Sequence, residues 1–310
     1  MQDTAVKSRL AALCAVSGMA ALGLTDNFVP FITERGSLWQ FHFLRGLMAV
    51  AILMVLAALG FGILRPRRFW AVAGRGLFQA GAMLIYFGCL AFLPIGVVVA
   101  GLFTSPLFVL MISALFQGKR VGPWRWGAVA VGFAGALMVI RPDPSDLDPV
   151  AFLPLLAGAL YAIGAVATRA WCEGESTMVM TAGFFGMLAV MGGIGVLVLP
   201  GAEVAGAEGF VSRTWGPLDG AMWFWIAVQA VGSLIGIGFL VRGYQLGEAG
   251  HVAIFEYSLL IFASFWAYIL WGQEVPPLAF SGMALIALAG AVIALRSDEP
   301  STLRAPEAVE

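Results

Sequence analysis

Residues 127–141 read GAVAVGFAGALMVIR, and residues 282–296 read GMALIALAGAVIALR. A constant offset of 155 positions aligns the two stretches, which begin on glycine and end on Arg141 and Arg296. Each stretch is apolar and long enough to form most of a helix that crosses a bilayer. The match indicates that one half of the chain duplicates the other.

The composition around these stretches is that of a membrane protein. Of the 310 residues, 61% are hydrophobic and 11% are charged, whereas soluble proteins carry about 25% charged residues. This excludes a soluble enzyme, a nucleic-acid binder and a disordered chain. Ten apolar windows have the length a bilayer requires: residues 9–32, 38–60, 70–92, 95–117, 123–140, 151–172, 177–199, 219–241, 249–271 and 278–295. The sequence therefore predicts an all-α membrane protein with ten transmembrane helices.

Charge and cysteine content limit the partners of the chain. The net charge is −1, so no basic arm is available for nucleic acid. Cys14, Cys89 and Cys172 form no CxxC motif, and the sequence predicts neither a disulfide framework nor a metal site. The apolar run after Arg9 reaches Ile32, too long for the core of a signal peptide, so it is interpreted as the first span.

The distribution of Lys and Arg predicts the orientation of the helices. With the N-terminus in the cytoplasm, thirteen of these residues fall on cytoplasmic loops and helix ends, and only Arg35, Arg141 and Arg213 fall outside. The thirteen are Lys7, Arg9, Arg65, Arg67, Arg68, Arg75, Lys119, Arg120, Arg125, Arg169, Arg242, Arg296 and Arg304. Because cytoplasmic loops are enriched in Lys and Arg, both termini are expected in the cytoplasm.

Five spans in each half predict an inverted repeat, because a unit with an odd number of spans enters the membrane from opposite sides in its two copies. We expect a first five-helix repeat at residues 1–141, a periplasmic linker at 142–150, a second repeat at 151–296 and a disordered cytoplasmic tail at 297–310. Inverted repeats are typical of alternating-access transporters, whose two halves exchange conformations around a central site.

The end of each half carries a further pattern. Residues 115–140 read LFQGKRVGPWRWGAVAVGFAGALMVI, and residues 270–295 read LWGQEVPPLAFSGMALIALAGAVIAL. Together with Phe41-His-Phe-Leu-Arg45 and Phe255-Glu-Tyr257, these stretches resemble the EamA-like branch of the drug/metabolite transporter superfamily. The resemblance covers essentially the whole chain and implies ten spans arranged as five plus five. Members of that family move amino acids, nucleotide derivatives, sugars, vitamins and drugs, so it does not define the solute. One departure is Gly118-Lys119, where the family usually has Gly-Glu.

Ionisable residues within the predicted spans are the main binding candidates. Asp26 (beside Asn27) lies in the first span, His42 and Arg45 in the second, and Glu256 in the ninth. Such side chains cost about 2.5–3.5 kcal/mol each to insert, so they normally face a partner or a water-filled cavity. We interpret them as substrate-binding residues. A structural ion pair between Asp26 and Arg45 is the alternative.

Glu256 is also the candidate for carrying a coupling proton, because a carboxyl group in an apolar environment can exchange a proton near neutral pH. It has no obvious cationic partner at its depth. Tyr257 and Ser258 follow it, and Trp266 lies deeper in the same span, where either solute stacking or core packing would explain it.

A polar interruption in the fourth span is the counterpart of this segment. Thr104 matches Ser258 at an offset of 154, and Ser105 and Pro106 follow Thr104. Proline removes a backbone hydrogen bond, so Pro106 predicts a hinge whose freed carbonyls face a cavity. A proline kink without a ligand is the alternative, since prolines are common in membrane helices.

Four further polar residues are weaker candidates for substrate binding. Gln79 and Tyr86 lie on one face of the third span, and Gln229 and Ser233 lie on one face of the eighth. They could equally form hydrogen bonds between neighbouring helices.

These features predict a secondary active transporter of a bacterial-type inner membrane. Its solute is expected to be amino-acid-like, or another zwitterionic or polar-aromatic metabolite. A vitamin or nucleoside derivative, similar to riboflavin or S-adenosylmethionine, is the alternative. Expected partners are the solute, the bilayer, and a proton or counter-solute, and the chain is expected to be a monomer or a homodimer without a cofactor.

Functions of other classes are a non-transporting scaffold or receptor and an intramembrane enzyme. A scaffold would not explain the inverted halves. Catalysis is not expected, because Asp26 is the only aspartate within a span, and His42 and His251 lack metal-ligand spacing. No Walker motif is present, so direct ATP hydrolysis is not expected either.

Overall fold

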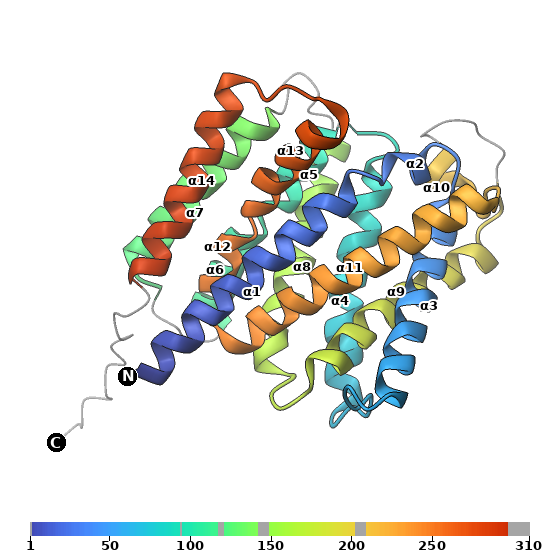
Figure 1. The fold of residues 1–310 in the computed structure, drawn as a ribbon, viewed down its shortest axis with the longest axis horizontal. Helices are drawn as coiled ribbons and strands as arrows, with labels where there is room; N and C mark the ends of the chain where they lie inside the picture. Colours follow the sequence, from blue (N-terminus) through green and yellow to red (C-terminus); the bar gives the residue numbers. More distant parts are fainter. Residues whose placement is uncertain (1, 94, 117–120, 142–148, 202–208, 297–310) are drawn as a thin grey trace.

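A computed structural model of the chain describes residues 2–93, 95–116, 121–141, 149–201 and 209–296. Within these ranges the regular structure is helical, and the helices form one inclined bundle (Figure 1). The helices are α1 (Gln2–Asp26), α2 (Pro30–Thr33), α3 (Leu38–Ala58), α4 (Phe69–Cys89), α5 (Ile95–Leu102), α6 (Ser105–Phe116), α7 (Pro123–Ile140), η2 (Pro149–Phe152), α8 (Leu153–Ala170), α9 (Thr177–Val198), α10 (Gly209–Ser212), α11 (Gly220–Leu246), α12 (Ala249–Phe255), α13 (Ser258–Trp271) and α14 (Pro277–Arg296). Most of the expected linker and all of the expected tail lie outside the described residues.

Eight helical segments in the described part of the chain are long and apolar enough to cross a membrane. The interrupted pairs α5–α6 and α12–α13 each count as one segment among these eight. α4 is not among them, and α14 contributes a shorter apolar segment, Pro277–Ile293. The count of ten spans therefore stays a prediction.

One of the eight spans is interrupted between α5 and α6, beside the predicted hinge. Pro106 is the second residue of α6, where its missing N–H removes no helical hydrogen bond. The Thr104 hydroxyl donates to the carbonyl of Gly101 at 2.6 Å and so satisfies an acceptor at the end of α5. The sequence thus explains this interruption locally.

A second interruption separates α12 from α13 at Glu256, without a proline or glycine. The N–H of Leu259 donates to the carbonyl of Glu256, three residues earlier, at 3.0 Å. This is the spacing of a 3₁₀ turn, which often marks a hinge within a longer helix. The Ser258 hydroxyl donates to the carbonyl of Phe255 at 2.6 Å, as Thr104 does in the first interruption.

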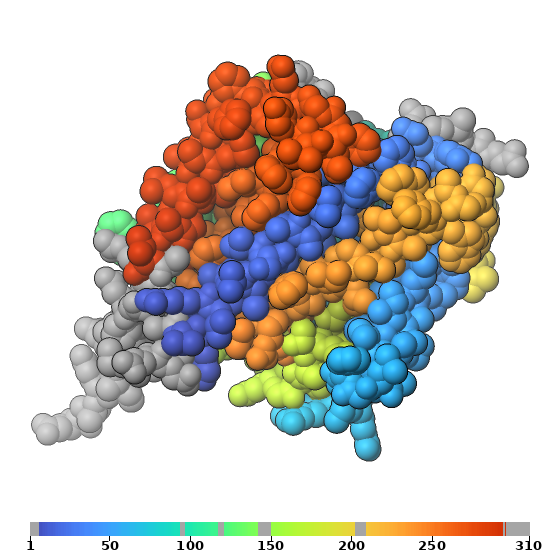
Figure 2. Space-filling view, in the orientation of Figure 1, coloured from blue at the N-terminus to red at the C-terminus, as the bar shows by residue number. Residues whose placement is uncertain are grey.

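Helices from the two halves pack in pairs. α1 lies along α11, α3 along α9, α4 along α8, and α7 along α14. Figure 1 shows α7 and α14 side by side at one edge of the bundle, and Figure 2 shows α1 (blue) and α11 (gold to orange) adjacent on the displayed face. Each pair joins a helix before residue 141 to one after it, so neither half forms its core alone.

The closest backbone approach in the α7–α14 pair involves Gly135 and Gly282. A Cβ atom on Gly135 would lie 2.6 Å from the carbonyl oxygen of Gly282. Forcing extra atoms into a packed contact typically costs ~1–3 kcal/mol. We expect Gly135→Leu to lower the melting temperature of the purified protein in detergent. Gly127→Leu is the matched control on the same helix, because nothing lies within 4 Å of its Cβ position, and equal melting temperatures for the two variants would contradict this packing account.

The bundle has two ends, which we name after residues of α11. The Asp219 end is where α11 begins, and the Gly247 end is where it finishes. α1 runs antiparallel to α11, because Thr25 lies against Gly232 and Ala11 against Gly247. The end of α1 and the start of α3 are therefore at the Asp219 end.

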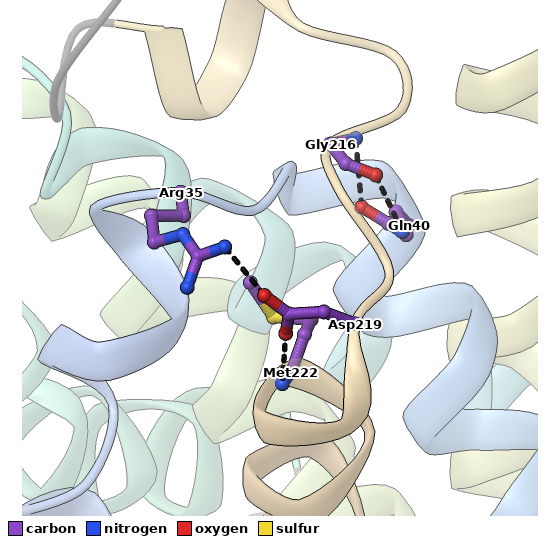
Figure 3. A network of polar contacts seen from close by, with 5 residues as sticks. All are labelled: Arg35, Gln40, Gly216, Asp219 and Met222. Atoms are coloured by element: carbon purple, nitrogen blue, oxygen red, sulfur yellow. Dashed lines mark hydrogen bonds and ion pairs between the residues drawn. The ribbon is translucent and has the colours of Figure 1, made fainter.

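A strap formed by residues 209–219 fastens the start of α3 to the start of α11. Figure 3 shows its two main attachments. The Gln40 side chain and the Gly216 backbone exchange two hydrogen bonds, of 3.2 and 2.9 Å. Arg35 donates to the Asp219 carboxylate at 2.6 Å, and the same carboxylate caps α11 by accepting the N–H of Met222 at 2.9 Å. The strap thus closes the Asp219 end on the α3–α11 side.

The Asp219 contacts make stability depend on pH. The hydrogen bond from the Met222 N–H, together with the Arg35 guanidinium, holds the pKa of Asp219 below its usual value. A lowered folded-state pKa stabilises the fold above the unfolded-state pKa, about 3.9, and this contribution is lost as pH falls through the folded-state value. We expect Asp219→Ala to lower the melting temperature at pH 7, and the difference from the native protein to shrink below about pH 4.

Asp219→Asn separates the two contributions, because asparagine retains the cap and removes the charge. Its melting temperature at pH 7 should lie between those of the native protein and the alanine variant. A difference between native and alanine proteins that stays constant from pH 7 to about pH 3.5 would contradict the ionic component.

Candidate functional site

A cavity lies at the centre of the bundle, where the two interrupted spans meet α1, α3, α4, α8, α9 and α11. It has about 90 Å³ of space for the centres of water-sized molecules, enough for several waters. Six of the predicted substrate-binding residues line it: Asp26, Arg45, Tyr86, Ser105, Ser233 and Glu256. Much of the remaining wall is apolar or aromatic. The cavity therefore combines opposite formal charges with aromatic faces.

A larger vestibule adjoins this cavity towards the Asp219 end. It has about 560 Å³ of comparable space and shares Asp26, Tyr86, Phe103 and Leu259 with the cavity. Its other residues include Trp271, which ends α13. The vestibule thus lies on the Asp219 side of the cavity, and the two spaces meet at the four residues that line both.

Arg45 lies against two aromatic rings at the cavity wall. Its guanidinium carbon lies 4.6 Å from the centroid of the Phe41 ring and 5.4 Å from that of Phe87, within the range of cation–π contacts. Nη2 lies 3.1 Å from Nδ1 of His42. Because a guanidinium can only donate, Nδ1 of His42 must accept, and the imidazole proton is on Nε2. Nε of Arg45 is buried without a partner in the described structure, so donors remain for an anionic group.

Asp26 and Arg45 both line the cavity without pairing directly. No ion pair within 4 Å joins them in the part of the chain that the structure describes. Gln229 supports this region by donating to the carbonyl of Thr25 at 2.6 Å. Asn27 lines the vestibule and donates to the carbonyl of Gly23 at 2.7 Å. The geometry therefore does not support the alternative of a direct structural ion pair between Asp26 and Arg45.

Glu256 lies at the α12–α13 interruption with only 6% of its surface exposed. One carboxylate oxygen accepts from the Tyr161 hydroxyl at 3.4 Å and also from the Tyr244 hydroxyl. These two tyrosines satisfy the buried carboxylate in place of the absent cationic neighbour.

The other predicted residues do not line the central cavity. The hydroxyls of Thr104 and Ser258 are bound to backbone carbonyls, and Ser258 lines a separate apolar crevice beside α14. Tyr257 is fully buried and stacks on Phe103, with ring centroids 5.7 Å apart. The remaining residues that do not line it are His42, Gln79, Pro106, Gln229 and Trp266. The binding roles of all these residues stay predictions. The contacts that the structure gives them are contacts with other parts of the protein.

Sequence reasoning missed three residues around Glu256. Tyr161 and Tyr244 lie in predominantly apolar helices that also contain other polar residues, so their signal in the sequence was weak. Arg75 was predicted only as a cation near a cytoplasmic helix end, and the structure adds that it is buried inside the bundle, with 1% of its surface exposed. Its guanidinium donates to the Thr168 hydroxyl at 2.9 Å and to the Met180 carbonyl at 3.0 Å, which ties α4 to α8 and α9.

Comparison with known families and proteins agrees with this architecture. Residues 9–141 match the model of the EamA-like transporter family. The riboflavin transporter of Rhizobium johnstonii is 25% identical over 270 residues, which cover 87% of this chain and 83% of that protein. The pseudopaline exporter CntI of Pseudomonas aeruginosa is 29% identical, over 69% of this chain and 71% of the exporter. The S-adenosylmethionine uptake transporter of Rickettsia felis is 23% identical, over 66% of each chain.

A solved structure described as the crystal structure of a protein superposes with a TM-score of 0.72. The match covers 94% of this chain and 99% of the other, at 19% identity, and so it shows the fold alone. The family match covers less than half of the chain, and the relatives are named as transporters of small molecules. With eight apolar helices in its described part, the chain is a multi-pass membrane protein.

Proposed function

We infer, from the match of residues 9–141 to the EamA-like transporter family, that this chain is a secondary carrier of a small organic metabolite. The observation that carries the proposal is the central cavity, where Asp26, Arg45 and Glu256 lie among aromatic walls beside two interrupted helices. Interrupted helices near the middle of the membrane typically form the solute site of secondary transporters.

The proposal includes ten membrane-crossing helices, arranged as two inverted five-helix units. In this arrangement α1, α3, α4 and α7 correspond to α8, α9, α11 and α14. Exchanging corresponding helices turns the α1–α11 contact into the α8–α4 contact and leaves the α3–α9 and α7–α14 contacts unchanged, which supports two-fold symmetry. The family match also ends at residue 141, the boundary we assign to the first unit.

The cavity favours a zwitterionic or amino-acid-like solute with an aromatic or other flat apolar part. The Arg45 guanidinium suits a carboxylate or phosphate, because its coplanar donors can bind two oxygens. Asp26 and Glu256 suit an ammonium or hydroxyl group, and Tyr86, Phe87 and Phe103 offer stacking faces.

The alternative solute class is a vitamin or nucleoside derivative. The relatives named for riboflavin and S-adenosylmethionine favour this class. S-adenosylmethionine belongs to both solute classes, since it carries an amino-acid group and is also a nucleoside derivative with an adenine ring. Riboflavin would use the aromatic walls without a carboxylate at Arg45.

Proteoliposomes offer the test of this function. The purified chain should catalyse counterflow of at least one radiolabelled solute from a panel of amino acids, S-adenosylmethionine and riboflavin, with and without a pH gradient. Counterflow distinguishes a carrier from a scaffold or enzyme, because labelled solute transiently accumulates against its own gradient. A pore that equilibrates every panel member without accumulation would contradict the proposal.

We propose that the Gly247 end faces the cytoplasm of a bacterial-type inner membrane, with both termini on that side. The excess of Lys and Arg that the sequence places there supports this orientation. In this orientation the vestibule opens to the periplasm.

A further inference from the structure

The cavity is closed towards the Gly247 end by a layer that contains two tyrosines. Tyr161 and Glu256 line the cavity floor. Tyr244 lies directly behind them, 1% exposed, in a core cluster that also contains Leu110 and Val252. The boundary between cavity and core therefore passes through the hydroxyl–carboxylate contacts.

The contacts join three separate helical elements. Tyr161 belongs to α8, Tyr244 to α11, and Glu256 to the interruption between α12 and α13. Both hydroxyls donate to the same oxygen of Glu256. Removing either hydroxyl loosens one helix from the interruption without creating a large cavity, because phenylalanine retains the ring.

Because Glu256 lies at the interruption, the two tyrosines that bind it can hold α12 and α13 in a fixed relative position. Its backbone forms a 3₁₀ turn in place of continuous α-helical bonds. α13 lines the vestibule, whereas α12 packs against α6 in the core beyond the cavity floor. A movement at this turn would thus change access to the cavity.

In the part of the chain that the structure describes, Glu256 is bound by the two tyrosine hydroxyls and forms no ion pair. Arg75 on α4 is the buried cation behind the floor, within electrostatic reach of both hydroxyls. Across the cavity, Asp26 comes from α1 and Arg45 from α3. Each tyrosine is therefore within electrostatic reach of both Glu256 and Arg75, and its hydroxyl contacts Glu256.

On this geometry, and resting on the carrier function proposed above, we propose that Tyr161 and Tyr244 are the gate at the Gly247 end. Their hydroxyls hold the Glu256 carboxylate and so keep the α12–α13 turn in the closed position. The gate opens when these two hydrogen bonds break. The tyrosines are positioning residues, because they act on access to the cavity through Glu256.

Thiol labelling tests the gate independently of any solute. Val252 is fully buried one helical turn before Glu256, on the Gly247 side. Val252→Cys, in a full-length protein whose Cys14, Cys89 and Cys172 are replaced by serine, would place a single thiol behind the gate. Valine to cysteine removes little volume, so the probe should fold.

We expect a polar maleimide to modify this introduced thiol slowly in the otherwise native protein. Tyr161→Phe and Tyr244→Phe should each raise the rate about 10- to 150-fold, because a hydrogen bond to a charged group contributes ~1.5–3 kcal/mol. The double variant should be fastest. Tyr257→Phe is the matched control, since it removes a buried hydroxyl that has no hydrogen-bond partner in the described structure.

An unchanged rate in the double variant would overturn the gate. So would an equal rate increase in Tyr257→Phe, because the effect would then be a general loosening of the bundle. Melting temperatures of all variants, measured in parallel, identify such loosening. Failure of the carrier function would appear as absent counterflow and would leave the labelling contrast intact, so the two proposals fail separately.

Discussion

Glu256→Gln should abolish solute accumulation driven by a pH gradient while leaving counterflow at constant pH. Glutamine retains the side-chain shape and an oxygen that can accept from Tyr161 and Tyr244, but it cannot bind and release a proton. We expect gradient-driven uptake to fall at least about 10-fold, since general proton-transfer roles typically contribute 10²-fold or more. The measurement is uptake into proteoliposomes with an acidic exterior, compared with counterflow in the same preparation.

Glu256→Ala is the informative companion to this variant. It removes the proton carrier and also the acceptor for both tyrosines, so we expect loss of uptake together with a lower melting temperature. Asp26→Asn is the matched control within the cavity, because it neutralises the second carboxylate and leaves Glu256 intact. Wild-type accumulation in Glu256→Gln would contradict the proton-coupling role and make this residue structural.

Arg45→Ala should raise the solute concentration needed for half-maximal counterflow about 10- to 100-fold. Hydrogen bonds to a charged group contribute ~1.5–3 kcal/mol, and Arg45 is the cavity residue that can bind an anionic group of the solute. The change removes a buried cation that packs against Phe41 and Phe87, so the measurement should be paired with a melting curve.

Arg45→Lys separates charge from geometry. Lysine retains the positive charge but cannot offer two coplanar donors or pack against the aromatic rings in the same way. We expect an intermediate affinity if the solute carries a carboxylate or phosphate. Equal half-saturation in the native, lysine and alanine proteins would show that Arg45 does not contact the solute.

The sequence predicted the helical segments well because hydrophobicity and length are local properties. The predicted spans 38–60 and 177–199 correspond to α3 (Leu38–Ala58) and α9 (Thr177–Val198), within a few residues. The interruption at Thr104 was also predictable, because Pro106 marks it chemically. The interruption at Glu256 has no such marker, and the sequence did not predict it.

The cavity was predicted in part, because helix rotation is decided by packing. Asp26, Arg45 and Glu256 were identified from the cost of burying charge, and all three line the cavity. Arg75 shows the limit of that reasoning. It lies seven residues into α4, close enough to the end to resemble a loop cation, yet Thr168 and Met180 provide buried acceptors from distant helices.

The central claim is that one cavity is exposed alternately to the two sides of the membrane. Ser105→Cys in the cysteine-free background tests it most directly, because Ser105 lines the cavity and cysteine is of similar size. A membrane-impermeant maleimide would be applied to right-side-out and inside-out vesicles in separate experiments. We predict modification from both sides, without passage of the reagent across the membrane. Modification from one side alone, or leakage of the reagent through the protein, would contradict the account.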